Sequence, residues 1–319
     1  MEHSKKQLKS NIFMFVLLLA LVFAALFLGR EETHAGEGDV TKELYKKQDI
    51  DYGYTIDREE YDISPRYSAD GKLIETGTAD QAVIICAGDL MCEPAMSEAA
   101  YFDGKYCFNH FFKYISPVLK SADLALANLE TIVSDKIPYA HEIHKVAHET
   151  GPRYHCNAPV EYLEALRYAG FDGLVLANNH NADGGYEGII DTLNNIDEYG
   201  FMRTGMFKDA DESRVLVVNI NNIKVGILSY TEHINRDLDE EILTKKGCEI
   251  MLNRYSKEKL KEDIANAKEQ GAEFILSYIH LKGKEYSTTV LDRQRVTAQE
   301  MADAGVDCVV GTHMHCIQE

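Results

Sequence analysis

The sequence predicts an α/β fold built around largely parallel β-sheet, and two patterns carry this prediction. Apolar runs of β-forming residues recur along the chain, and three of them follow a helical stretch. Between helix and strand stand a glycine and an acidic residue, at 169–172 (AGFD), 270–273 (QGAE) and 304–307 (AGVD). This order of helix, glycine cap and buried strand is what βαβ units require.

Five of the apolar runs lead into residues that can bind a metal. The runs cover 83–88, 124–127, 174–177, 274–279 and 308–311. The residues that follow them are Asp89, Asn128 with Glu130, Asn178 to His180, His280, and His313 with His315. Because ligands bind outside the carboxyl ends of the strands in such a sheet, we expect these side chains to meet at one sheet edge.

Further elements complete the predicted fold. A sixth strand is expected at 224–230, and His233 follows it as a candidate lining residue of the same site. Helices are expected at 160–169, 187–199, 257–270 and 293–304, because apolar residues recur there at helical spacing. Together with the five runs, these segments distribute strands and helices over the chain after residue 81.

Composition narrows the class of protein. The 319 residues are 45% hydrophobic, which leaves room for one large core or two domains. The formal net charge of −19 argues against a nucleic-acid partner, since sequence-independent binding of nucleic acid needs a basic surface. An anionic substrate would therefore need a local cation, such as a metal ion. The seven cysteines form no CxxC pair, so the expected ligand set contains no sulfur.

The N-terminus predicts membrane attachment. Three lysines precede an unbroken apolar run of 17 residues at 12–28, which is close to the lower length limit for a spanning helix. Positive residues stay on the cytoplasmic side, so residues 1–30 are expected to form a single-pass anchor in the cell membrane with the rest of the chain outside the cytoplasm. Cleavage after 33–35 (THA) is the alternative.

The rest of the chain divides into two parts. Residues 31–80 are acidic, rich in tyrosine and without periodicity, which predicts an extracytoplasmic stalk. Residues 81–319 are expected to form one domain. The sequence stops four residues after His315, just beyond a predicted central strand. We therefore expect the domain to extend beyond the end of this sequence.

The residues at the strand ends suit a divalent metal centre. Carboxylate, imidazole and amide oxygen are the ligands that hard or borderline divalent metals take when no thiolate is offered. Two metals about 3.5–4 Å apart can act on a phosphoryl group, and such a pair needs roughly six protein ligands. The candidates are Asp89, Glu130, Asn179, His280, His313 and His315. His180 would act as a general acid, and Asp183 would orient its imidazole.

Each of these motifs alone has a simpler interpretation. Asp89 after glycine is typical of a turn, and Asn128 with Glu130 could be a helix N-cap and a solvated charge. The segment 178–180 (NNH) is typical of a turn with a surface histidine. The segment 313–315 (HMH) is the most specific, because alternate residues at a strand end point the same way. Their joint occurrence at strand ends favours a site.

Four of the motifs resemble those of a known family. They are 88–91 (GDLM), 127–130 (ANLE), 177–180 (ANNH) with Asp183 and Gly184, and 311–315 (GTHMH). In this order, from about residue 82 to the end, the chain resembles the bacterial capsule-synthesis, or poly-gamma-glutamate biosynthesis, CapA-type family. That family belongs to the calcineurin-like metallophosphatase superfamily.

The resemblance implies a fold and a function. The expected fold is a four-layer α-β-β-α metallophosphatase-like sandwich after an N-terminal transmembrane helix. The expected function is a membrane-anchored role in making a capsule or poly-gamma-glutamate, with one or two Mn, Fe or Zn ions, a phosphoester or anionic-polymer substrate, and polymer synthesis or export proteins as partners. The alternative is a non-catalytic scaffold or tether. Two departures bear on this choice: Met91 replaces a histidine of the superfamily, and 280–286 (HLKGKEY) has one residue more than the family's His-x-Gly-x-Glu-Tyr.

Overall fold

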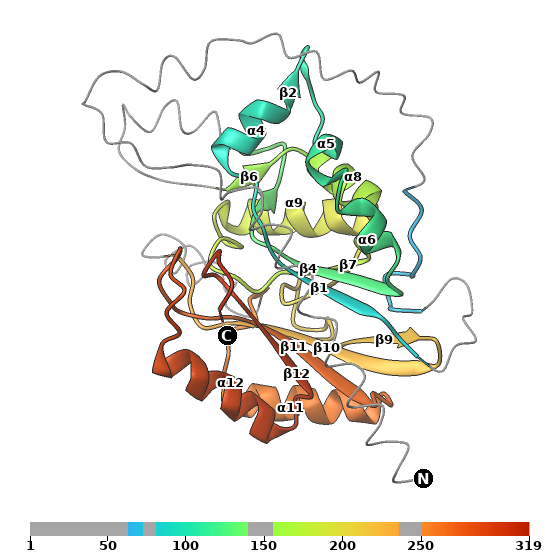
Figure 1. The fold of residues 1–319 in the computed structure, drawn as a ribbon, viewed down its shortest axis with the longest axis vertical. Coiled ribbons are helices and arrows are strands. Elements are labelled where there is room, and N and C mark those ends of the chain that lie inside the picture. The colour runs from blue at the N-terminus through green and yellow to red at the C-terminus, as the bar shows by residue number, and fades with distance from the viewer. Residues whose placement is uncertain (1–62, 73–80, 140–155, 236–250, 319) are drawn as a thin grey trace. The chain divides into compact units, whose positions relative to one another are not determined.

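Two four-stranded sheets stand at the centre of the computed structural model, which describes residues 63–72, 81–139, 156–235 and 251–318 (Figure 1). The first sheet has the order β1-β4-β7-β8, and all its neighbours pair in parallel. Its strands are β1 (Ile84–Leu90), β4 (Leu124–Leu129), β7 (Gly173–Val175) and β8 (Met202–Thr204). The parallel pairing brings the carboxyl ends of these strands to one edge.

The second sheet has the order β12-β11-β10-β9, and its last strand alone runs antiparallel to its neighbour. Its strands are β12 (Cys308–Thr312), β11 (Phe274–His280), β10 (Ile223–Thr231) and β9 (Leu216–Ile220). The predicted α/β fold with parallel sheets is confirmed, and all six predicted strands are present. Within these two sheets, the strands that were not predicted are β8 and β9, and each lies at a sheet edge.

A hydrophobic core joins the two sheets. Leu126 and Val175 of the first sheet and Ile227 and Leu276 of the second are buried in one cluster. Burying one such side chain contributes about 1.5–3 kcal/mol relative to leaving it exposed. The sheets therefore pack face to face, which holds their carboxyl ends in a fixed relation.

Helices cover the other face of each sheet. The cluster on the first sheet includes side chains of α4 (Pro94–Ala100), α5 (Asn109–Phe112), α6 (Ser116–Lys120), α8 (Glu161–Ala169) and α9 (Gly185–Glu198). The cluster on the second sheet includes side chains of α11 (Lys257–Glu269) and α12 (Asp292–Ala304). The clusters place the elements in the order helices, sheet, sheet, helices, as Figure 1 shows. All four predicted helices are present.

The predicted order of helix, glycine and acidic residue has a structural reason in the described chain. Gly170 and Gly305 end α8 and α12 with φ values of 103° and 110°, a left-handed conformation that glycine adopts without a Cβ clash. Each acidic residue then binds the first part of the neighbouring strand. Asp172 Oδ2 accepts from Ala125 N at 2.8 Å, and Asp307 Oδ2 accepts from Ile275 N at 3.0 Å.

Two small sheets were not predicted from the sequence. One is the hairpin of β2 (Tyr101–Phe102) and β3 (Lys105–Tyr106), and the other is the parallel pair of β5 (Ile132–Val133) and β6 (Asn157–Ala158). Each strand has two residues, too few for an alternating pattern. The pair β5–β6 lies beside α9, and Val133 N donates to Thr192 Oγ1 on that helix at 2.9 Å.

Part of the predicted stalk packs on the sheets. Within residues 63–72, Arg66 Nε donates to Asp172 Oδ1 at 2.9 Å, and Tyr67 is buried with its hydroxyl donating to the Asp123 carbonyl at 2.7 Å. The predicted anchor at 1–30 and the remainder of the stalk lie outside the described residues. Among the residues that are described, no helix is long and apolar enough to cross a membrane.

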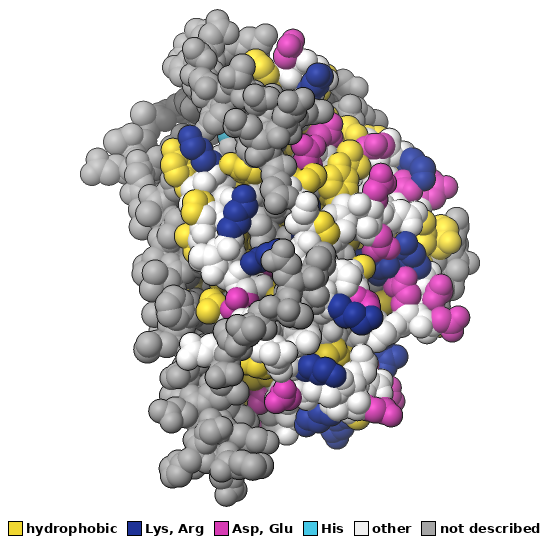
Figure 2. All heavy atoms as spheres, turned by 90° about the vertical axis from the view of Figure 1, so that its right-hand side faces the viewer, with side chains coloured by type: hydrophobic (Ala, Val, Ile, Leu, Met, Phe, Trp, Pro, Cys, Tyr) yellow, Lys and Arg dark blue, Asp and Glu magenta, His cyan; other side chains and the backbone are white. Residues whose placement is uncertain are grey.

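Charged side chains of both signs are mixed on the surface. On the face in Figure 2, described acidic and basic side chains lie among one another rather than gathering by sign. Ion pairs such as Arg203 with Glu212 at 2.9 Å and Arg214 with Glu262 at 3.2 Å show the same mixing.

Candidate metal centre

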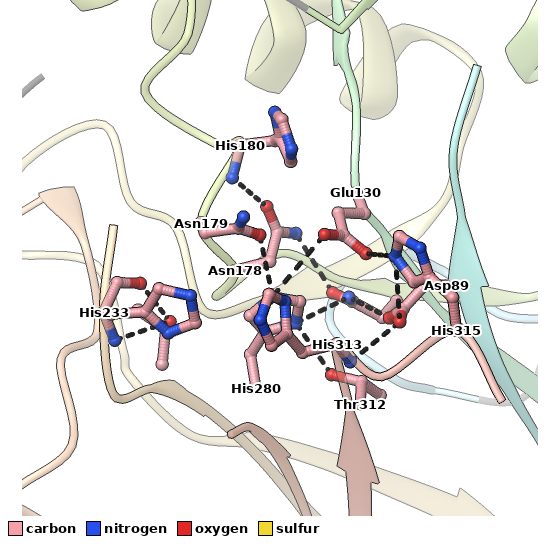
Figure 3. A network of polar contacts seen from close by, with 12 residues as sticks. Asp89, Glu130, Asn178, Asn179, His180, His233, His280, Thr312, His313 and His315 are labelled. Atoms are coloured by element: carbon pink, nitrogen blue, oxygen red, sulfur yellow. Dashed lines mark hydrogen bonds and ion pairs between the residues drawn. The ribbon is translucent and has the colours of Figure 1, made fainter. Parts of the chain in front are cut away.

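The predicted site residues stand at strand ends of both sheets. Asp89 lies near the end of β1, and Glu130 directly follows β4. His280 is the last residue of β11, and His313 directly follows β12. Figure 3 shows these side chains converging. The expectation of one sheet edge was wrong, because the packing of the two sheets brings two sets of carboxyl ends together.

Glu130 is the most deeply buried carboxylate of this group. Its side chain is 1% exposed, Oε2 lies 3.2 Å from His315 Nε2, and Oε1 lies 3.5 Å from His280 Nε2. Among the described residues, Oε1 has no hydrogen-bond partner. Burial raises the pKa of Glu130 to about 7 despite the hydrogen bond with His315. A buried oxygen without a partner is costly, so this position favours a ligand that the described residues do not supply.

Asp89 is held by groups from both sheets. Its Oδ1 accepts from Asn128 Nδ2 at 2.7 Å, and its Oδ2 accepts from the backbone N–H of His313 at 2.8 Å. The same Oδ2 lies 3.7 Å from His315 Nε2. Ligand atoms of Asp89, Glu130 and His280 all lie within 4.8 Å of one another. This spacing suits two carboxylates and an imidazole around a divalent cation.

His280 faces the site with a defined ring orientation. Its Nδ1 lies 2.9 Å from Thr312 Oγ1, and its Nε2 lies 2.8 Å from Asn179 Oδ1. Burial, followed by the neighbouring imidazoles, lowers the pKa of His280 well below its ordinary value. The ring is therefore neutral, which is the form that binds metals. Asn179 is held in turn by Asn235, whose Oδ1 accepts from Asn179 Nδ2 at 2.9 Å.

The two histidines of the 313–315 segment have different neighbours. The ring of His313 lies 4.8 Å from that of His280 between centroids, whereas His315 contacts Glu130. Both residues follow the end of β12 at Thr312, and both have positive φ, 99° and 50°. Strand alternation therefore does not explain where these rings lie, although both reach the same site, with centroids 6.4 Å apart. Positive φ in a side-chain-bearing residue costs about 1–3 kcal/mol and persists where surrounding contacts impose it.

His180 and Asp183 form the predicted pair. His180 Nδ1 lies 2.7 Å from Asp183 Oδ2, which also accepts from Cys156 N at 2.8 Å. Burial disfavours the imidazolium of His180, but the hydrogen bond and charge of Asp183 outweigh it and raise the pKa. His180 is 7% exposed, so the alternative of a surface histidine was wrong. Its ring lies apart from the other imidazoles in Figure 3, yet it is near enough to influence the pKa of Glu130.

Several amides that hold the site were not among the six predicted ligands. Asn178 Nδ2 donates to Asn128 Oδ1 at 3.1 Å and to the Leu129 carbonyl at 2.7 Å. Asn128 in turn binds Asp89. The sequence does indicate both Asn128 and Asn178, because they lie inside the motifs 127–130 and 177–180. Asn235 had no such signal, because it reaches Asn179 only through the folding of the loop after β10.

The six predicted ligands come together with the chemistry that a divalent metal requires. Carboxylate oxygens, imidazole nitrogens and an amide oxygen converge, and thiolate is absent from this set, which suits hard or borderline divalent ions. Glu130 Oε1, to which no described residue gives a hydrogen bond, lies in the same group. These clusters of His, Asp and Glu are consistent with metal binding.

Comparison with known proteins gives the family. The model of a family described as bacterial capsule synthesis protein PGA_cap matches residues 83–319. The chain is similar to the capsule biosynthesis protein CapA of Bacillus anthracis, with 28% identity over 251 residues that cover 75% of this chain and 56% of the relative. It is also similar to the PGA biosynthesis protein CapA of Bacillus subtilis (strain 168), with 26% identity over 216 residues. These cover 65% of this chain and 51% of the relative.

The chain thus spans about half the length of these curated relatives. Among solved structures, it is similar to the calcineurin-like phosphoesterase YfkN from Bacillus subtilis, with 14% identity and a TM-score of 0.40 over 74% of this chain and 73% of that chain. The family match covers most of the sequence and all of the described site residues. This chain therefore belongs to the bacterial capsule synthesis protein family PGA_cap.

Proposed function

We propose that this chain is a membrane-anchored, extracytoplasmic protein of capsule or poly-gamma-glutamate biosynthesis with a metal-dependent hydrolase site for a phosphoester. The observation that carries the hydrolase proposal is the convergence of two carboxylates and several imidazoles near Glu130 Oε1, which has no hydrogen-bond partner among the described residues. A buried carboxylate with an unused oxygen is stabilised by a cation.

The metal ligands in this proposal are the six residues that meet at the strand ends. They are Asp89, Glu130, Asn179, His280, His313 and His315. One or two Mn, Fe or Zn ions fit this set of oxygen and nitrogen donors. When bound, such ions neutralise charge on a phosphoryl group and make water a better nucleophile.

The protein's own contribution to the chemistry centres on His180. With Asp183 holding Nδ1, the imidazole presents Nε2 as the atom that gives a proton to the leaving oxygen. The raised pKa of His180 favours the protonated form that a general acid needs. Asn235 Nδ2, 3.3 Å from His180 Nε2, limits the directions from which a leaving group reaches that atom.

Attachment to the membrane and the partners are proposed from the sequence. The apolar run at 12–28, preceded by lysines, supports a single-pass anchor with the sheets outside the cytoplasm. Polymer synthesis or export proteins of the same membrane are the proposed partners, and an anionic polymer or phosphoester is the proposed substrate.

A non-catalytic scaffold is the second candidate, and one observation favours it. Both oxygens of Asp89 accept hydrogen bonds from Asn128 and His313, and His315 contacts Glu130, so much of the site is bound by the protein itself. A centre that is closed in this way could hold the ends of the two sheets together and act only as a tether.

Metal analysis and a turnover assay on the full chain in detergent separate the two candidates. Two equivalents of metal with hydrolysis of an aryl phosphate support the hydrolase. One equivalent or none, without turnover, supports the scaffold. Metal-free protein should regain hydrolysis when Mn²⁺ or Zn²⁺ is restored, and a failure of every metal to restore it would overturn the hydrolase proposal.

A further inference from the structure

We propose that His233, which follows β10, is a metal ligand that completes a three-histidine centre with His280 and His313. This inference rests on the proposed metal site and adds a ligand to it. It also divides the site into two neighbouring positions, one rich in imidazole and one rich in carboxylate, with His280 between them.

The three imidazoles already have the spacing of a coordination group. Ligand nitrogens of His233, His280 and His313 all lie within 4.8 Å of one another. Ring centroids are 4.7 Å apart for His233 and His313, and 4.8 Å apart for His280 and His313. Figure 3 shows His280 and His313 between His233 on one side and Asp89 with His315 on the other. A tetrahedral ion bound by three histidines needs donors gathered at this spacing.

Two ring nitrogens in this group make no hydrogen bond within the described part of the chain. Nδ1 of His233 and Nδ1 of His313 are both buried and have no hydrogen-bond partner among the described residues. A buried polar atom without a partner destabilises the folded state. Two such atoms in neighbouring rings, whose centroids are 4.7 Å apart, point to one missing ligand rather than to separate defects.

The position of His233 is suitable for a ligand. The backbone is fixed, because Thr231 Oγ1 donates to the His233 carbonyl at 2.6 Å and accepts from its N–H at 3.3 Å. The imidazole is thus held beside those of His280 and His313.

The donor types predict the metal. Three imidazoles without a thiolate suit Zn²⁺ or Co²⁺, whereas the carboxylates of Asp89 and Glu130 suit a harder ion such as Mn²⁺. His280 lies between the two positions, since it is within 4.8 Å of the ligand atoms of His233 and His313 and also of those of Asp89 and Glu130. We therefore assign Zn²⁺ or Co²⁺ to the position formed with His233.

Cobalt titration of the metal-free full chain in detergent tests this assignment. Co²⁺ bound by three histidines gives a visible absorption band, and metal analysis gives the number of ions. The variants are His233→Phe, which keeps a ring in the same space, and His233→Ala. His110→Phe is the matched control, because His110 is a half-buried histidine outside the site. Thermal unfolding of each metal-free variant checks that it is folded.

We expect both His233 variants to lose the band and to bind this Co²⁺ more weakly by at least the 10- to 100-fold that is typical of a residue that only supports a ligand. His110→Phe should titrate like the natural sequence. Unchanged band and affinity in folded His233→Phe would overturn the assignment of His233 alone. If the natural sequence binds no Co²⁺, Zn²⁺ or Mn²⁺, the proposed metal site itself fails, and the two failures are thus distinguishable.

Discussion

Glu130 Oε2 lies 3.2 Å from His315 Nε2, and this contact joins the carboxyl ends of the two sheets. Glu130 follows β4 of the first sheet, and His315 follows β12 of the second. Burial disfavours the imidazolium of His315, but Glu130 and Asp89 outweigh it and raise the pKa to about 9. The protonated ring thus balances the buried carboxylate, a role that a bound cation takes over in the proposed function.

Replacing His315 tests whether this histidine is a ligand. His315→Ala removes an imidazole that faces both Glu130 and Asp89. We expect metal content to fall and turnover to be lost as a consequence. Elemental analysis of the purified full chain measures the first effect, and aryl phosphate hydrolysis measures the second. His110→Ala is the control, and a His315→Ala protein with full metal content would refute the ligand role.

Replacing His180 separates a proton donor from a ligand. His180→Ala should keep the metal content unchanged and slow turnover by roughly 10²- to 10⁴-fold, as removal of a general acid does. The loss should be smaller with an aryl phosphate than with an alkyl phosphate, because an activated leaving group needs no proton. Kinetics on the two substrates, with metal analysis, check this.

Asp183→Asn provides the matched variant for His180. Its amide still contacts Nδ1 of His180 but lacks the charge that raises the pKa of the imidazole. We therefore expect a milder defect with the same dependence on the leaving group. Loss of metal from His180→Ala, to the degree seen in His315→Ala, would place His180 among the ligands instead.

Asp197 should give the fold a measurable dependence on pH. Burial opposes its ionisation, but hydrogen bonds from Arg203 at 2.6 Å and Lys208 at 2.7 Å outweigh it and lower the pKa below the ordinary 3.8. A carboxylate whose pKa is lower in the folded than in the unfolded state stabilises the fold at pH values above its unfolded pKa. This contribution is lost as the pH falls through the folded pKa. Asp197→Asn should therefore cost about 0.5–1 kcal/mol near neutral pH.

Urea unfolding at neutral and acidic pH measures this difference. The gap between Asp197→Asn and the natural sequence should narrow as the pH falls below about 4, where the carboxylate becomes protonated. Glu269→Gln, at an exposed carboxylate, is the control and should show no such change. A gap that stays constant over this range would show that Asp197 acts by packing and not by charge.

Gly205 should tolerate no side chain. Its φ is +97°, and a Cβ there would lie 2.7 Å from Ala177 N and 2.7 Å from Ser229 Oγ. Gly104 has a similar φ of +77° but nothing within 4 Å of its Cβ position. Gly104→Ala should cost about 1 kcal/mol from backbone strain alone. Gly205→Ala should cost more than about 2 kcal/mol, because overpacking adds to the same strain.

Thermal or urea unfolding of both glycine variants measures these costs. Because Ala177 directly precedes the amides Asn178 and Asn179, Gly205→Ala should also lower metal content. Equal destabilisation in the two variants would show that the close approach at Gly205 has little energetic weight.

The sequence alone was sufficient for the main elements, because their signals are local. The run 124–127 predicted β4, which is buried along its whole length, and the helical periodicity at 257–270 predicted α11. The order of glycine and acid predicted helix ends such as Gly170, where a left-handed residue is required. Short strands such as β8 and the β5–β6 pair carry no periodic pattern, since two or three residues do not complete one.

For the site, the sequence determined which residue types stand at the strand ends, and the tertiary structure decided which of them meet. The six ligand candidates were named from local runs, but the convergence of two sheets rather than one edge depends on the core between Leu126 and Leu276. The different neighbours of His313 and His315, and the place of His233 beside His280, depend on backbone turns after the strands have ended. Such contacts join segments far apart in the chain, so their geometry follows from how the buried faces pack and not from any local pattern.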